Sequence, residues 1–410
     1  MATRKDDRGR VLEKNEYQRE NGSYQFVYKD VMGNKKAVYA PDLATLREKE
    51  KKIQIAAWQG VDAERGNTLM LNDVFDRYMS TKLGLKETTI ASYNEAYNRY
   101  VRDEFGKRLV KKIKNSDIRA FYSYLLKEKK ISIRTVEHLQ VILHPTFEMA
   151  MEDGILLKNP TKGILAQIRA SHTYSTDRRH AISVEDQRIF LDYIKGHRVW
   201  GRYHSIFVIL LGTGLRASEF TGLRWEDVDI ENRKISVNHG LVKIKAIKGV
   251  CKERYAISTP KTNAGIRTVP IMDPVMEAFI EEYEYNLARG FSKYEVDGYS
   301  GFIFTNGNGT PYTAVRLDEI IRKAVASYNK LQDAAAERDG TEPRYLPCFS
   351  CHILRHTFCT RLCEQDVNIK VIQAVMGHAS VKITMDIYAE VSEEKKLSEL
   401  DKLAQNWKVF

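Results

Sequence analysis

The sequence is poor in the residues that stabilise small secreted domains. It has five cysteines in 410 residues, and an odd number argues against a disulfide framework. No apolar run is long enough to cross a bilayer, and the first residues lack the apolar segment of a signal peptide. There is also no internal repeat and no low-complexity tract. These absences disfavour a secreted or a membrane protein, so we expect a soluble, cytoplasmic chain.

Two groups of cysteines resemble haem or metal motifs. Cys348 to His352 spells the attachment pattern of a c-type haem, but such attachment requires export, which the N-terminus does not support. Cys359 and Cys363 lie on the same helical pattern as Leu362, where buried thiols act as small apolar residues. Because no second pair of ligands accompanies them, we expect no metal and no cofactor.

Length and charge favour a large protein with an anionic partner. Hydrophobic residues make up 43% of the chain, enough to bury ample core, and the length suggests roughly two to four domains. Lys and Arg number 65 against 54 Asp and Glu, a formal net charge of +11. An excess of positive charge favours a polyanionic partner or an anionic surface.

The most informative stretch begins at Cys351 and contains His352 and Arg355. These two residues stand three apart, so they share one face of a helix. A cation and an imidazole then point in the same direction. Neither residue is a strong signal alone, since histidines are often hydrogen-bonded core residues.

A tight corner between two helices is expected at Gly377. Glycine accepts positive φ and ends a helix without strain, and Ser380 suits the N-cap of the next helix. His378 is then fixed between two helices, and Tyr388 lies at the far end of the second one. Arginine, histidine and tyrosine without clustered carboxylates suit a phosphodiester, because cations bind its oxygens and a phenol can attack phosphorus.

Together these pieces resemble a known signature. His-Ile-Leu-Arg-His-Thr-Phe at 352–358, Met-Gly-His at 376–378 and then Tyr388 are similar to the C-terminal motif of tyrosine recombinases, the phage integrase family. The match lies in their order and spacing. Family members often have glycine at the position of Asp366, and Asp tolerates positive φ better than most residues.

Arg216 is the candidate for a second phosphate-binding arginine. Residues 212–219, Gly-Thr-Gly-Leu-Arg-Ala-Ser-Glu, turn sharply into a helix and present Arg216 near free backbone amides. They resemble the first arginine box of the tyrosine recombinases. The alternative is an ordinary surface pair with Glu219. Arg224 is the rival arginine, but the resemblance gives it a structural role.

Lys261 is the candidate general acid. Strands are expected at 234–237, 254–257 and 265–271, and the segment 259–264 between the last two is expected to be a hairpin loop. Lys261 in this loop resembles the β-hairpin lysine of the family, which protonates the leaving 5′ oxygen. A lone loop lysine is more often solvated charge, and Lys243, Lys245, Lys248 and Lys252 are alternatives.

We expect a mostly α fold with small β-sheets (α+β). The expected domains are an arm-type DNA-binding domain at 1–66, a helical core-binding domain at 67–168, a linker at 169–180, a catalytic domain at 181–390 and a helical tail at 391–410. The N-terminal module resembles the arm-binding domain of integrases from Gram-positive conjugative transposons. Its basic residues favour DNA contact, and the alternative is a solvated basic leader. Helices are also expected near 276–287 and 314–331, followed by a polar loop at 333–347.

The resemblance implies a site-specific DNA recombinase that integrates and excises a mobile element through a 3′-phosphotyrosine. By this resemblance Arg216 and Arg355 clamp the phosphate, Tyr388 attacks, His352 and His378 assist, and Lys261 protonates the leaving group. The implied partners are double-stranded DNA at core and arm sites, further copies in a tetramer on DNA, and an accessory excision factor. The alternatives are a type IB topoisomerase-like enzyme and a non-catalytic DNA-binding regulator on the same scaffold.

Overall fold

The protein consists of two compact units, Met1–Ser175 and Thr176–Phe410. Its computed structural model describes residues 4–29, 35–58, 68–171, 180–246, 252–260 and 262–389. The fold is mostly helical with small antiparallel sheets, as predicted from the sequence. The predicted domain boundaries stay predictions, and the predicted tail at 391–410 lies outside the described residues.

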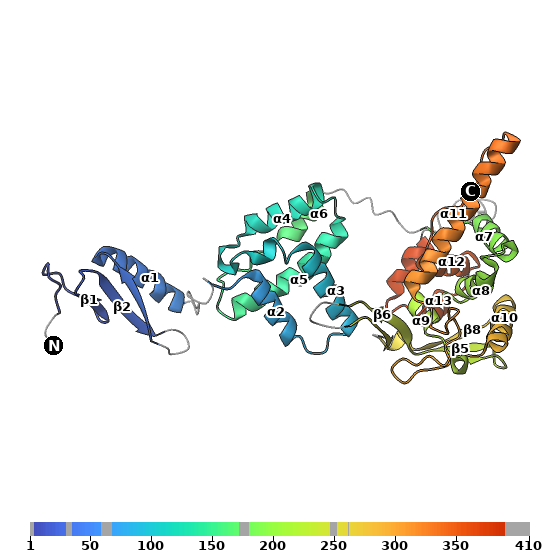
Figure 1. Ribbon diagram of the computed structural model, residues 1–410, viewed down its shortest axis with the longest axis horizontal. Coiled ribbons are helices and arrows are strands. Elements are labelled where there is room, and N and C mark those ends of the chain that lie inside the picture. The colour runs from blue at the N-terminus through green and yellow to red at the C-terminus, as the bar shows by residue number, and fades with distance from the viewer. Residues whose placement is uncertain are drawn as a thin grey trace, which may run out of the picture. The chain divides into compact units, whose positions relative to one another are not determined.

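The N-terminal part combines a small sheet with one helix (Figure 1). Strands β1 (Glu16–Gln18), β2 (Tyr24–Lys29) and β3 (Lys35–Ala40) pair antiparallel in that order, and helix α1 (Leu43–Trp58) follows. Asp42 caps the helix by accepting from the backbone N–H of Thr45 at 2.8 Å. The small core contains Tyr24, Phe26, Ala40, Leu43 and Leu46.

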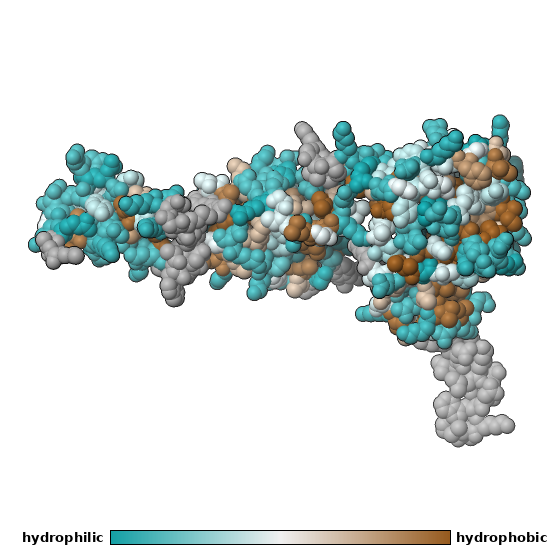
Figure 2. All heavy atoms as spheres, turned by 90° about the horizontal axis from the view of Figure 1, so that it is seen from below, coloured by the Kyte–Doolittle hydropathy of each residue, from teal (hydrophilic) through white to brown (hydrophobic). Residues whose placement is uncertain are grey.

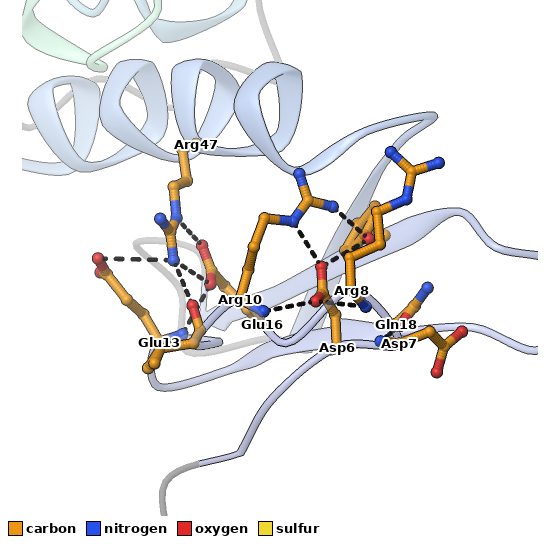
Figure 3. A network of polar contacts seen from close by, with 10 residues as sticks. Asp6, Asp7, Arg8, Arg10, Glu13, Glu16, Gln18 and Arg47 are labelled. Carbon is orange, nitrogen blue, oxygen red and sulfur yellow. Dashed lines mark hydrogen bonds and ion pairs between the residues drawn. The ribbon is translucent and has the colours of Figure 1, made fainter.

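Two carboxylates, those of Asp6 and Glu16, organise the polar contacts of this part (Figure 3). Asp6 accepts hydrogen bonds from the backbone N–H groups of Arg8 and Arg10, from Nε of Arg10 at 2.8 Å and from the hydroxyl of Tyr24 at 2.9 Å. Burial opposes ionisation, but these hydrogen bonds lower the pKa of Asp6 to about 2. Arg10, one of the basic residues considered for DNA contact, is therefore engaged within the fold.

The rest of the first unit is a helical bundle. It contains α2 (Leu71–Thr81), α3 (Glu87–Tyr100), α4 (Asn115–Lys127), α5 (Ile133–Glu152) and α6 (Ile164–Ser171). Ser132 caps α5 by accepting from the backbone N–H of Thr135. In the core the rings of Phe75 and Tyr97 stack with centroids 3.6 Å apart. Apolar residues spaced three and four positions apart thus bury one face of each amphipathic helix.

The second unit begins with helices and then forms its strands. Helices α7 (Val184–Gly196), α8 (His204–Thr213) and α9 (Ala217–Thr221) come first. Strands β4 (Val228–Asp229), β5 (Lys234–Val237) and β8 (Arg267–Pro270) form one antiparallel sheet, and β6 (Gly240–Ile244) pairs with β7 (Arg254–Ser258) in a separate one. The last described elements are α10 (Asp273–Arg289), α11 (Ala314–Asp339), α12 (Cys351–Glu364), α13 (Ile369–Met376) and a helical segment at 381–389.

Two local predictions are wrong. The segment 259–264 is not a hairpin loop, because β7 pairs with β6 while β8 pairs with β5; the segment instead joins two different sheets. Helix α11 extends to Asp339, eight residues beyond the predicted end at 331, so the start of the predicted 333–347 loop is helical. Gly340 ends this helix with φ of 67°.

The hydropathy of the surface is consistent with a chain rich in charged residues. The face seen in Figure 2 is mainly hydrophilic, with scattered apolar residues. None of the described helices is long and apolar enough to span a membrane.

We predict that Asp6→Asn destabilises the N-terminal sheet, because an amide replaces the ionised acceptor of the Arg10 and Tyr24 hydrogen bonds. The pKa of Asp6 is lowered from about 3.9 in an unfolded chain, so its contribution exists above that pH and is lost as pH falls to about 2. The effect is measured as the thermal unfolding of the sheet in the wild type and the variant, followed by the NMR resonances of the β2 amides from pH 2 to 7. The neighbouring exposed carboxylate gives the control Asp7→Asn, and equal losses in both variants would contradict the prediction.

Candidate active site

The centre of the candidate site is the C-terminal end of α13. Gly377 ends this helix with φ of 63°, as predicted. Three arginines from three other elements donate to three consecutive backbone carbonyls there. The pairs are Arg267 Nε to Val375 O at 2.6 Å, Arg355 Nη2 to Met376 O at 2.5 Å, and Arg216 Nη2 to Gly377 O at 2.7 Å. Helix-end carbonyls lack intrahelical partners and carry partial negative charge, so they orient the guanidiniums.

Arg216 is held by a buried carboxylate. It precedes α9, and its Nη1 and backbone N–H donate to the two carboxylate oxygens of Glu219 at 2.6 and 2.9 Å. The pair that the sequence leaves as an alternative therefore forms. It is not an ordinary surface contact, because the Glu219 side chain is only 8% exposed and also binds Arg267. The Arg216 side chain is 40% exposed and can reach a ligand.

Arg355 is almost completely buried, 5% exposed, on α12. Its Nη1 donates to the carbonyl of Gly214 at 2.7 Å. Burial, followed by repulsion from Arg216, lowers the pKa of Arg355 to about 9, and Glu219 opposes this shift. The guanidinium therefore stays charged at neutral pH. Gly214 has φ of 59°, and a Cβ there would lie 2.3 Å from the Phe358 ring, so glycine is required beside Arg355.

His378 is buried beside the arginines and is 7% exposed. Its Nδ1 and the hydroxyl of Thr384 share a hydrogen bond of 2.9 Å. Burial and then the charge of Arg355 lower the pKa of His378 to about 4. The imidazole is consequently neutral at physiological pH and can donate a single N–H hydrogen bond.

His352 and Tyr388 are the exposed members of the predicted set. His352 is exposed in the first turn of α12, and its electrostatic interaction with His378 is the smallest of the causes that lower the pKa of His378. Tyr388 is 36% exposed, within the helical segment 381–389. Ile387 beside it packs against the apolar cluster of α12 and α13. Among the described residues, Tyr388 has no hydrogen bond with Arg216 or Arg355.

The structure therefore brings together Arg216, Arg355 and His378, with His352 near them. Tyr388 stands on the same short helix as Thr384, the partner of His378. Lys261 lies outside the described residues. Asp366, where family members often have glycine, has φ of 55°, in the left-handed region that Asp tolerates.

Sequence reasoning missed Arg267 and underestimated Glu219. Arg267 was assigned only to a strand, and Glu219 only to a surface pair. Their side chains meet across 48 residues, with Arg267 Nη2 2.8 Å from Oε2 of Glu219. No local pattern announces this contact. The one available signal was an arginine at the start of a strand whose other residues suit a sheet.

The buried thiols serve as packing groups. Cys359 and Cys363 lie in the apolar cluster with Phe358, Ile372 and Met376, as the sequence predicts. The hydrogen bond to Cys363, followed by burial, raises the pKa of the Cys359 thiol. A thiol kept protonated in this way is a small apolar residue, not a nucleophile.

Known families match three parts of the chain. The phage integrase family matches residues 182–395, the DNA binding domain of tn916 integrase matches residues 1–57, and the N-terminal SAM-like domain of phage integrases matches residues 70–126. The first match covers every described residue of the candidate site.

Individual relatives cover nearly the whole chain. The transposase from transposon Tn916 of Enterococcus faecalis is 28% identical over 413 residues, spanning 98% of this chain and 96% of the relative. Among solved structures, the Tn1549 transposon integrase in complex with a circular intermediate DNA is 29% identical, with a TM-score of 0.69, and covers 82% of this chain and 100% of that one. A lambda integrase dimer bound to a core site, 18% identical with a TM-score of 0.51, covers 92% of this chain and 95% of its own and shares the fold.

We predict that Gly377→Ala destabilises the second unit and impairs the site. At φ of 63° an L residue costs about 1–2 kcal/mol, and here the added Cβ would also lie 2.9 Å from Ala264 O and 3.0 Å from Cδ of Arg267. Gly340→Ala is the matched control, since its φ is 67° with nothing within 4 Å of the added Cβ. Urea unfolding should show the larger loss for Gly377→Ala, and equal losses would argue against a packing constraint at the corner.

We also predict that His378 stays neutral down to about pH 5, because burial and Arg355 hold its pKa at about 4. Its ring resonances, followed by NMR of labelled histidine, should show no titration between pH 5 and 8. Arg355→Gln should move the pKa upward, because a neighbouring positive charge is removed. Arg361→Gln serves as the control, since Arg361 pairs with Glu364 on the same helix. A wild-type titration near pH 6.5 would refute the assignment.

Proposed function

This chain belongs to the phage integrase family of tyrosine recombinases, and we propose that it cleaves and rejoins DNA as the site-specific recombinase of a mobile element. The relatives that span the chain are named transposases from the transposons Tn916 and Tn1545. The Tn1549 integrase was solved in complex with transposon right end DNA. One observation carries the chemical proposal. Arg216 and Arg355 are fixed on neighbouring carbonyls of a single helix end, which suits two guanidiniums gripping one phosphate.

The electrostatics of the cluster favour an anionic substrate. Arg216, Arg267 and Arg355 carry three positive charges, and Glu219 supplies one negative charge among them. A phosphodiester brings a further negative charge to the exposed side of Arg216. As negative charge builds on the non-bridging oxygens, guanidiniums already held in place stabilise it without reorganising.

The proposed nucleophile is the phenol of Tyr388. Its oxygen attacks phosphorus, the bond from phosphorus to the 5′ oxygen breaks, and a 3′-phosphotyrosine forms. His352, exposed at the start of α12, accepts the phenolic proton, and Lys261 gives a proton to the leaving 5′ oxygen. The intermediate retains the energy of the phosphodiester, so the 5′ hydroxyl of a second strand can reverse the attack without a cofactor.

His378 acts as a hydrogen-bond donor in this scheme. Its low pKa makes it neutral, so it neither adds a fourth charge nor serves as a strong acid. The hydrogen bond with Thr384 orients the ring, and it also links the corner after α13 to the helix of Tyr388. The hydrogen bond from this neutral donor to the phosphate strengthens as negative charge develops on the phosphate. It weakens again after cleavage.

The remaining parts of the proposal concern DNA and assembly. The N-terminal part binds arm sites, since it matches the DNA binding domain of tn916 integrase, and the bundle binds the core site. Recombination of two duplexes requires several active sites, so we propose a tetramer on DNA, with an accessory factor for excision. Access to chromosomal DNA places the protein in the cytoplasm.

The decisive test is a nicked suicide substrate, from which the short strand beyond the scissile phosphate diffuses away after cleavage. We predict that the wild-type protein becomes covalently trapped at a 3′ phosphate. Tyr388→Phe should abolish the trap, because it removes the attacking oxygen, while its DNA affinity in gel-shift titrations should be unchanged.

Tyr283→Phe is the matched control, because Tyr283 is also exposed on a helix of the second unit, at 47%, and plays no part in the scheme. It should trap DNA as the wild type does. Absence of any trapped wild-type complex on element ends would sink the enzyme proposal and favour a non-catalytic DNA-binding protein. Trapping without strand exchange between paired sites would favour topoisomerase-like relaxation.

A further inference from the structure

Arg267 makes an unusual set of contacts for a residue of a short strand. It is the first residue of β8, paired with Val237 of β5. Its side chain is 5% exposed, yet it uses all three guanidinium nitrogens. Nε donates to Val375 O at 2.6 Å, Nη2 donates to Oε2 of Glu219 at 2.8 Å, and Nη1 donates to Oε1 of Glu219 at 3.1 Å and to Gly265 O at 3.3 Å.

The carboxylate of Glu219 bridges Arg216 and Arg267. Its Oε1 accepts from Nη1 of Arg216 and Nη1 of Arg267, while its Oε2 accepts from the backbone N–H of Arg216 and Nη2 of Arg267. A carboxylate with four donors in two directions has a single orientation. The plane of the Arg216 guanidinium is therefore set by a group that Arg267 holds in place.

The exposures of the arginines separate their roles. Arg216 is 40% exposed, whereas Arg267 is buried and directed at protein groups through each of its nitrogens. A phosphate can reach the first and not the second. From this geometry we infer that Arg267 is a positioning residue, which fixes the phosphate-binding orientation of Arg216 through the Glu219 carboxylate.

A second contact ties the same arginine to the helix end. Arg267 binds the carbonyl that precedes those bound by Arg355 and Arg216. Its Cδ and Nε also fill the space that a Cβ on Gly377 would occupy, at 3.0 and 3.1 Å. β8, α9 and α13 lie together in the second unit (Figure 1), so a shift of Arg267 alters the corner after α13 as well as Glu219.

Lysine cannot replace Arg267 in this arrangement. Its ammonium is a single donor centre, whereas the guanidinium bridges a carboxylate and a carbonyl in one plane. Burial raises the pKa of Glu219, and Arg267 and Arg216 lower it. In Arg267→Lys the positive charge is kept, so the carboxylate stays ionised but loses its fixed plane. The expected defect is therefore misorientation of Arg216 and not loss of charge.

The inference rests on the proposed function, and its test uses the full-length chain on the same suicide substrate. We expect Arg267→Lys to lower the single-turnover cleavage rate about 100-fold, the scale of a misplaced reacting group, with DNA affinity unchanged. The matched control is Arg202→Lys. Arg202 makes a comparable two-pronged pair with the fully buried Glu282, at 2.6 and 2.9 Å, in the same unit. Both variants should lose thermal stability, and only Arg267→Lys should lose rate.

A double-mutant cycle distinguishes positioning from a general structural effect. If Arg267 acts through Arg216, then adding Arg267→Lys to Arg216→Lys should slow cleavage by less than about threefold further, because the oriented group is already gone. A substrate with sulfur as the bridging 5′ atom, a better leaving group, keeps these slow variants measurable. Should Arg267→Lys not fold, Arg267→Gln, whose amide still donates to Glu219, takes its place in the cycle.

Each outcome is decisive. A wild-type protein that never forms the covalent complex overturns the proposed function itself. A wild type that cleaves, together with an equally fast Arg267→Lys, overturns only the inference about Arg267. Multiplicative losses in the double variant, or a rate loss in Arg202→Lys equal to that in Arg267→Lys, would show a structural effect that does not pass through Arg216.

Discussion

The second unit depends on how three positive groups are held close together at the end of α13. Guanidiniums repel one another, and burial adds to the cost of each charge. The structure offsets this with three consecutive carbonyls that the helix leaves without partners, together with the carboxylate of Glu219. Each guanidinium is thereby oriented as well as neutralised in part. A site of this kind is assembled before any phosphate arrives.

The same constraint explains the residues around it. Glycine is needed at 377 to end α13 at positive φ, and at 214 because the Phe358 ring occupies the space of a side chain. The lowered pKa values of Arg355 and His378 follow from burial and from the crowding of positive charge. His378 is consequently a neutral hydrogen-bond donor beside charged arginines. The arginines supply positive charge, and His378 supplies a directional hydrogen bond.

The first unit shows the same use of a buried carboxylate on a smaller scale. Asp6 gathers the backbone around Arg10 and binds the Tyr24 hydroxyl, while Glu16 receives Arg47 from α1 (Figure 3). These contacts fold the basic N-terminal stretch onto its own sheet. Arg10 and Arg47 are thereby engaged in internal pairs.

The sequence by itself determined the fold class, the family resemblance and the local geometry at Gly377, because helix ends, caps and periodicity depend on residues within a turn or two of one another. It did not determine that β7 and β8 belong to different sheets, or that Arg267 shares Glu219 with Arg216. Arg267 and Glu219 stand 48 positions apart, and Arg216 and Gly377 stand 161 apart. Only the packing of β8, α9, α12 and α13 brings them within hydrogen-bonding distance. A guanidinium can donate hydrogen bonds to many different acceptors, so the tertiary structure decides which acceptors it binds.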